Sequence, residues 1–174
     1  LWLAGVFTYV FARSLGQRRS SSTAAGLIFQ GSGFLLVSSA VFPMILGAAI
    51  WLPLLLTCIE KIIGVSESPE GAGKSLPWAA LGAIVLGTQI LAGHIEITYY
   101  TLLIMAVYAL WRLVSVALKA RRSELVEQHA VEAWYRIALR PLPWLVGLVA
   151  VGLMLGALQL IPFYEVGQLN FREG

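Results

Sequence analysis

Long apolar runs separated by short polar connections recur along the whole chain. A membrane-crossing helix needs roughly 20 mostly apolar residues, because each residue advances the helix by about 1.5 Å and the hydrocarbon core is about 30 Å thick. The runs continue to the end of the chain, so a signal peptide does not explain them. The pattern predicts about six membrane-crossing helices, at approximately 1–12, 23–39, 43–62, 77–93, 97–118 and 142–163.

Prolines mark several of the predicted helix starts. Pro43, Pro77 and Pro141 stand at or beside the beginning of a run, where a missing backbone N–H costs little. Pro53 lies inside the third run. We therefore expect a kink there, with the freed carbonyl satisfied by a neighbouring helix.

Residues 123–140, SELVEQHAVEAWYRIALR, follow a different pattern. Apolar side chains recur at helical spacing, with Glu and Arg residues on the opposite face. This predicts an amphipathic helix that lies on the inner leaflet, with Trp134 and Tyr135 at headgroup depth. A helix packed on a soluble domain is the alternative. His129 falls on the polar side of this helix, where we expect it to be solvated.

The positions of Lys and Arg set the predicted orientation. The connections after the first, third and fifth helices carry these residues, whereas the second (SAVFP) and the fourth (GHIE) carry none. We therefore predict that the odd connections are cytoplasmic and that the even ones, together with the C-terminal end, face outward. The basic residues concerned are Arg13, Arg18, Arg19, Lys61, Lys74, Arg112, Lys119, Arg121, Arg122, Arg136 and Arg140.

The composition agrees with a membrane protein. Of 174 residues, 59% are hydrophobic and 12% are charged, whereas a soluble domain usually carries about 25% charged residues. The predicted fold class is an all-α polytopic transmembrane bundle with one cytoplasmic interfacial helix, forming a single integral membrane domain over residues 1–174. The chain begins without Met inside an apolar run, so we expect it to be a fragment of a longer protein.

The net charge and the cysteine content change this predicted fold class little. The net charge is +3, and the excess lies at membrane edges, so we expect membrane lipids rather than nucleic acid as partners. Cys58 is the only cysteine. A single thiol inside an apolar run is typical of a small packing residue.

The turn between the fourth and fifth runs contains the candidate chemistry. His94 and Glu96 stand there between two long stretches without charge. Ionisable groups at membrane depth indicate a functional site, but a hairpin tip that emerges into water would carry them at no cost. Other polar residues are predicted at the same outward face and are candidates for substrate binding: Tyr99, Tyr100, Tyr164, Glu165 and Arg172.

These residue types allow several chemistries. Histidine with two glutamates suits a divalent metal, but the His-x-Glu spacing is awkward on a helix, and we expect neither a metal nor another cofactor. A neutral His94 can take or give a proton near pH 7, and Glu96 can orient it or bind a cation. Tyrosine and Arg172 can bind a sugar or a phosphate. Gln30 and Gln89 are expected to hydrogen-bond across helices, or else to line a transport path.

Four short motifs occur in a familiar order: AAGLIFQGSGF, AAIWLPLLLTCIEKI, LAGHIEITYYTLL and LGALQLIPFYEV, with a short turn after the first. In their order and spacing, from about Leu15 to Glu165, they resemble the YfhO family of bacterial membrane proteins, which belongs with the GT-C type of polytopic glycosyltransferases. The family's histidine turn commonly reads Gly-His-Pro-Gln. Here Gly93 and His94 match, whereas Ile95 and Glu96 depart from it.

The resemblance implies an enzyme of the bacterial cytoplasmic membrane that takes a sugar from a polyprenyl-phosphate carrier. Transfer would take place at the outer face, to a cell-envelope acceptor. Related enzymes place an essential acidic residue in their first outward loop, which we expect to lie upstream of this chain, so the catalytic base stays unassigned. His94, Tyr99 and Arg172 would hold the phosphate, and Glu96 and Glu165 would bind sugar hydroxyls.

Two other functions remain open. A transporter or lipid flippase would use Gln30, Gln89, His94 and Glu96 along a path, and would contain broken helices near mid-membrane. A scaffolding membrane subunit would tolerate substitution of His94 and Glu96.

Overall fold

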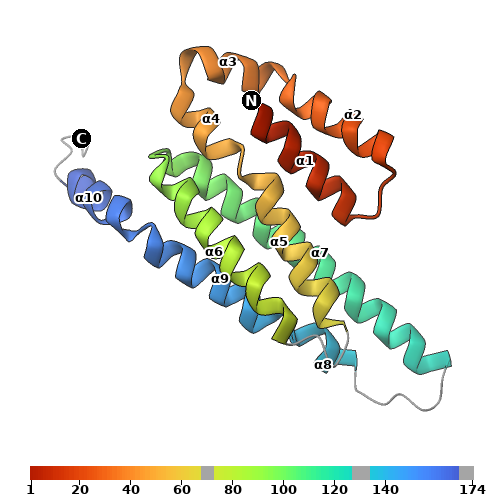
Figure 1. The fold of residues 1–174 in the computed structure, drawn as a ribbon. Coiled ribbons are helices and arrows are strands. Elements are labelled where there is room, and N and C mark those ends of the chain that lie inside the picture. The colour runs from red at the N-terminus through yellow and green to blue at the C-terminus, as the bar shows by residue number, and fades with distance from the viewer. Residues whose placement is uncertain (68–72, 127–133, 169–174) are drawn as a thin grey trace, which may run out of the picture.

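The computed structural model describes residues 1–67, 73–126 and 134–168, and within these ranges the chain is helical and has no strand (Figure 1). The predicted all-α fold is therefore confirmed. In chain order the helices are α1 (Trp2–Ser14), α2 (Arg19–Gln30), α3 (Gly33–Val41), α4 (Pro43–Ala49), α5 (Leu52–Ser66), α6 (Leu76–Leu91), α7 (Ile95–Val126), α8 (Trp134–Leu139), α9 (Leu142–Leu155) and α10 (Ala157–Gln168).

Several helices have the dimensions of membrane spans. In the part of the chain that the structure describes, four segments are long and apolar enough to cross a membrane: Pro43–Ser66, Gly73–Leu91, Ile95–Arg122 and Tyr135–Leu155. Counting the bent pair α2 and α3 as one span makes five. The first predicted helix, α1, is present with 13 residues, or about 20 Å, which is shorter than the hydrocarbon core.

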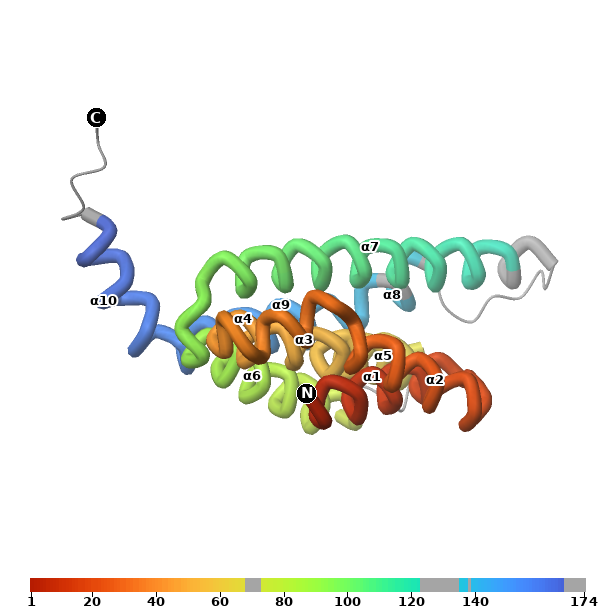
Figure 2. The backbone as a smooth tube through the Cα atoms, turned by 90° about the horizontal axis from the view of Figure 1, so that it is seen from above, coloured from red at the N-terminus to blue at the C-terminus, as the bar shows by residue number. Residues whose placement is uncertain are grey.

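The centre of the bundle is formed by α5, α6, α7 and α9. Their buried apolar side chains make one continuous cluster that includes Leu55, Ile62, Leu86 and Leu148. In Figure 2, α7 lies along one face of the bundle, while α10 projects away from it. The candidate site described below lies where α6 and α7 join.

Glycines bring α6 and α9 into close contact. A methyl group added at Gly152 would lie 2.9 Å from Cβ of Leu86, and one at Gly156 would lie 2.8 Å from Cβ of Ile90. Conversely, a methyl group added at Gly87 of α6 would lie 2.8 Å from Cβ of Leu155 of α9. Because small residues on each helix accept larger side chains of the other, the backbones approach closely, as they do in packed membrane helices.

Glycines also allow close packing between α1 and α2. A methyl group at Gly26 would lie 2.6 Å from the carbonyl oxygen of Gly5. Gln30 lies against Gly5 through its side-chain oxygen. A larger residue at Gly26 would require the backbone of α1 to move, and one at Gly5 would have to displace the Gln30 side chain, so these positions favour the observed crossing of the first two helices.

Two predicted helices are interrupted. The run 23–39 is broken between α2 and α3, which are bent by 43°. Gly31 ends α2, and the Ser32 hydroxyl then accepts the Leu35 N–H at 3.5 Å to start α3, so the local sequence favours a new helix start. In the third run, α4 ends at Ala49 and α5 begins at Leu52, immediately before Pro53.

The remaining boundaries also differ from those expected. Helix α7 continues to Val126, so residues 123–126 extend it instead of starting the interfacial helix. Most of that predicted helix, including His129, lies outside the described residues, and α8 forms its C-terminal part. The last run is divided at Gly156, which is packed against Ile90, and α10 leaves the bundle after it.

The helix ends separate into two groups (Figure 1). The C-terminal ends of α1, α5 and α7, which precede the basic connections, point toward one end of the bundle. The turn between α6 and α7 and the start of α10 lie toward the opposite end. This is the alternation that the Lys and Arg pattern requires, whichever end faces the cytoplasm.

Candidate functional site

The turn between α6 and α7 positions His94 as the cap of α7. Gly93 has a φ of 81°, a left-handed conformation that glycine adopts without a Cβ penalty and that lets the chain reverse sharply. The His94 Nδ1 atom accepts a hydrogen bond from the Ile97 N–H at 3.4 Å, and its carbonyl accepts from the Thr98 N–H at 3.3 Å. Since Nδ1 is an acceptor, a neutral His94 carries its proton on Nε2.

Glu96 and two tyrosines share the first turns of α7. The Tyr100 hydroxyl donates to Oε1 of Glu96 at 3.1 Å, and the rings of Tyr99 and Tyr100 lie 5.7 Å apart at 60°. A carboxylate in the first turn also interacts favourably with the positive end of the helix dipole. His94 is half-buried, while Glu96, Tyr99 and Tyr100 are exposed. The four predicted residues are therefore adjacent at one end of the bundle.

Helix α10 contributes to this end only through its beginning. The Gln159 side-chain nitrogen lies 3.8 Å from the Cβ position of Gly93. Tyr164 and Glu165 are further along α10, where they are exposed, and among the described residues no hydrogen bond joins them to His94 or Glu96. Arg172 lies outside the described residues. Within those ranges no group of three His, Cys, Asp or Glu side chains is placed to hold a metal ion.

A second polar cluster lies between α5 and α7. The Arg112 guanidinium donates from Nε and Nη2 to the two carboxylate oxygens of Glu60, each at 2.7 Å. The Tyr108 hydroxyl donates to the same carboxylate at 2.8 Å. The side chains of Arg112 and Glu60 are only 19% and 13% exposed. Every carboxylate oxygen thus has a donor, as a charge in a low-dielectric environment requires.

This cluster was not predicted, although the sequence contains a signal for it. Arg112 was assigned to the basic membrane edge, and Glu60 was given no role. Yet Arg112 is the only charged residue in the predicted helix 97–118, and Glu60 stands inside an apolar run. An acid in one apolar helix and a base in another indicate an ion pair between them.

The same two helices form a weaker ion pair further along. Lys119 Nζ lies 3.6 Å from Glu67 Oε2, and both residues are seven positions beyond Arg112 and Glu60. Because α5 and α7 run in the same direction (Figure 1), the two pairs lie in one register along the interface. The side chains of Lys119 and Glu67 are 78% and 35% exposed, so this pair contributes little on its own.

The two predicted amides behave differently. Gln89 of α6 is fully buried and donates from Nε2 to the Thr101 hydroxyl of α7 at 2.7 Å, which confirms its predicted bond across helices. Its Oε1 has no hydrogen-bond partner among the described residues. Gln30 contacts Gly5 of α1 at the end of α2.

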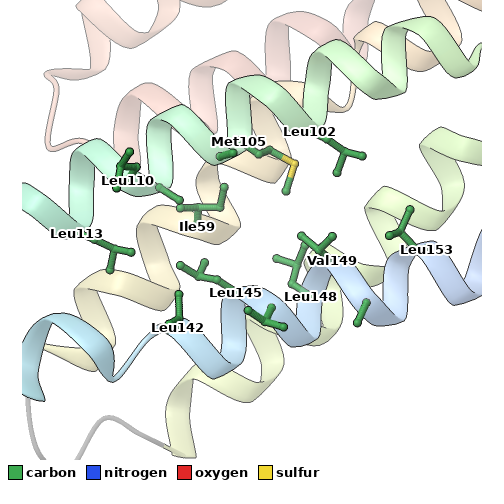
Figure 3. A pocket seen from close by; sticks show the side chains of 14 residues that line it. Ile59, Leu102, Met105, Leu110, Leu113, Leu142, Leu145, Leu148, Val149 and Leu153 are labelled. Atoms are coloured by element: carbon green, nitrogen blue, oxygen red, sulfur yellow. The ribbon is translucent and has the colours of Figure 1, made fainter.

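An apolar groove of about 650 Å³ runs between α7 and α9 (Figure 3). Ile59 of α5 lies at its base with Met105, Leu145 and Leu148, all of which are buried. Its edges include Leu110 and Val146, which are exposed. Every side chain that lines it is aliphatic, alanine or methionine.

Comparison with protein families, with curated proteins and with solved structures finds no match to this chain. The class that the fold and its long apolar helices define is an all-α bundle with the character of a multi-pass membrane protein.

Proposed function

We propose that this chain is part of a multi-pass protein of a bacterial cytoplasmic membrane that transfers a sugar from a polyprenyl-phosphate carrier to a cell-envelope acceptor. The reaction would take place at the end of the bundle that contains the turn between α6 and α7. This end would face outward, and the basic connections would face the cytoplasm.

One observation supports the proposal most strongly: four side chains able to bind or protonate a sugar phosphate lie together at that end. His94 can donate from Nε2, because its Nδ1 is occupied by the Ile97 N–H. Glu96 and Tyr100 form a hydrogen-bonded pair in the first two turns of α7, and Tyr99 presents an exposed ring beside them. Carboxylates and tyrosines of this kind suit sugar hydroxyls, and the imidazole suits a phosphate oxygen.

The resemblance to YfhO and GT-C proteins supplies the reaction itself. In the resembled family an acidic residue of an upstream outward loop is essential, so the chain would provide substrate contacts and the upstream region would provide the base. His94 is assigned to the carrier phosphate and Glu96 to the sugar.

The proposal is tested with the full-length protein in purified membranes. Transfer of a radiolabelled hexose from polyprenyl-phosphate hexose to endogenous acceptor is measured for His94→Ala and for the matched control Ser21→Ala, an exposed residue of α2. We expect His94→Ala to reduce transfer by at least tenfold, with unchanged helix content by circular dichroism. Equal transfer by both variants would contradict the assignment.

A lipid flippase or transporter is the second candidate, because α2 and α3 form a bent pair with Gln30 at the break. Interrupted helices are typical of substrate sites in transporters. Reconstituted vesicles containing a fluorescent polyprenyl phosphate distinguish the two functions. Lipid crossing without sugar transfer, slowed by Gln30→Leu, would favour the transporter.

A further inference from the structure

The groove between α7 and α9 has the length of one acyl chain. It extends along α7 from Leu102 to Leu113 and along α9 from Leu142 to Leu153. Eleven residues of helix span about 16 Å, and one leaflet contributes about half of a hydrocarbon core of roughly 30 Å. The groove is therefore as long as the hydrocarbon layer of a single leaflet is thick.

The shape of the groove separates it from an ordinary lipid-facing surface. Met105 and Leu148, at its base, are 4% and 1% exposed, whereas Leu110 on its edge is 64% exposed. A chain lying in it would contact α5, α7 and α9 at once (Figure 3). No lining side chain carries a polar group other than the methionine sulfur, so a polar ligand has no partner there.

The two ends of the groove differ in charge. At the Leu113 and Leu142 end, α9 is preceded by α8 (Figure 3), whose Arg136 is exposed. Arg112, next to Leu113, is already neutralised by Glu60.

The Leu102 and Leu153 end has no such cations. The nearby turn between α6 and α7 and the described part of α10 contain no Lys or Arg, and the acid Glu96 lies in the first turn of α7. An anionic headgroup is therefore favoured at the α8 end and disfavoured at the other.

We propose that this groove binds one acyl chain of an anionic phospholipid from the leaflet that α8 borders, with the phosphate held by Arg136. Tyr135, which is exposed beside Arg136, lies at the same headgroup level, where tyrosine is favoured. The assignment does not depend on sugar transfer and uses a different end of the bundle from His94. It commits to a phospholipid, because the charged mouth is at the end opposite to the proposed carrier phosphate.

The first test measures which lipid the purified full chain retains. Native mass spectrometry from detergent micelles compares phosphatidylglycerol with phosphatidylcholine of identical acyl chains. We expect one phosphatidylglycerol to be retained preferentially. Arg136→Gln should weaken that retention by about fivefold, because one basic residue near an anionic surface contributes about 1 kcal/mol.

The control replaces Arg18 and Arg19 by Gln at the start of α2, which lies away from α8 (Figure 1). It should retain phosphatidylglycerol as the unmodified chain does. Equal retention of the two lipids, or an equal loss in the control, would overturn the proposal.

The second test fills the groove. Ala109 lines it, whereas Val114 is an exposed residue of the same helix outside it. Ala109→Trp should abolish retention of phosphatidylglycerol, and Val114→Trp should leave it unchanged; Ala109→Leu serves if tryptophan prevents folding. Loss in both variants, or in neither, would show that the chain does not occupy the groove. Retention of a polyprenyl phosphate in competition with phosphatidylglycerol would also overturn the assignment.

Discussion

Arg112 of α7 and Glu60 of α5 are joined by two hydrogen bonds of 2.7 Å across 52 positions of sequence. The pair lies inside two segments of membrane-span length. Together with Tyr108 it leaves the carboxylate fully paired, and with Glu67 and Lys119 it fixes which turn of α5 faces which turn of α7.

Removing one partner of this pair should lower the free energy of unfolding much more than removing both. Arg112→Leu leaves the Glu60 carboxylate partly buried without its cation, and we expect a loss of about 3–5 kcal/mol in the free energy of unfolding. Glu60→Leu combined with Arg112→Leu removes both charges and should recover most of that loss. The measurement is unfolding by sodium dodecyl sulfate in mixed micelles.

Lys119→Ala is the matched control for the cation. Because Lys119 is largely exposed, the change should cost less than about 1 kcal/mol. A double variant at Glu60 and Arg112 that is less stable than either single variant would contradict the ion-pair account.

The contact between α6 and α9 predicts opposite effects at two glycines of the same helix. Gly152→Ala places a methyl group 2.9 Å from Cβ of the fully buried Leu86, so we expect a loss of about 1–3 kcal/mol. Gly147→Ala meets no atom within 4 Å and should gain up to about 1 kcal/mol from helix propensity. Thermal unfolding in detergent measures both, and equal shifts in one direction would refute the packing.

A substitution at Gly93 should destabilise the turn through backbone strain and not through steric overlap of the new side chain. A methyl group there meets only Gln159 at 3.8 Å, which is ordinary contact, but the φ of 81° should cost Gly93→Ala about 1–2 kcal/mol. Asparagine tolerates this conformation better, so Gly93→Asn should be the milder variant by the same unfolding measurement. A fully stable Gly93→Ala would show that the turn relaxes to another conformation.

The sequence predicted the class of fold because the strongest constraint on a membrane helix is local. Length, hydropathy and the position of Pro43 and Pro77 locate most helices within a few residues of their observed bounds. The breaks at Gly31–Ser32 and at Gly156 were missed. A hydropathy profile averages over a window of residues and does not resolve such positions. The direction of a helix, in contrast, depends on a single cap or on a contact with a helix distant in sequence.

The candidate site was predicted only where its residues are sequence neighbours. His94, Glu96, Tyr99 and Tyr100 fall together because one turn of one helix carries them. Tyr164 and Glu165 were grouped with these residues only because they were predicted at the same face of the membrane. Lying at the same face does not determine whether α10 packs against the bundle. The pairing of Glu60 with Arg112 could not be derived from spacing, since it depends on the register between α5 and α7.

The threading of the helices through a bilayer is tested most directly by cysteine labelling from the two sides. Glu96→Cys and Lys74→Cys are each introduced into a Cys58→Ser background and exposed to a membrane-impermeant maleimide in intact bacterial cells. A second sample is labelled after denaturation, which should reach both positions. We predict that position 96 is labelled in intact cells and position 74 only after denaturation. Labelling of both positions from the same side would contradict the proposed topology and, with it, an outward site at His94.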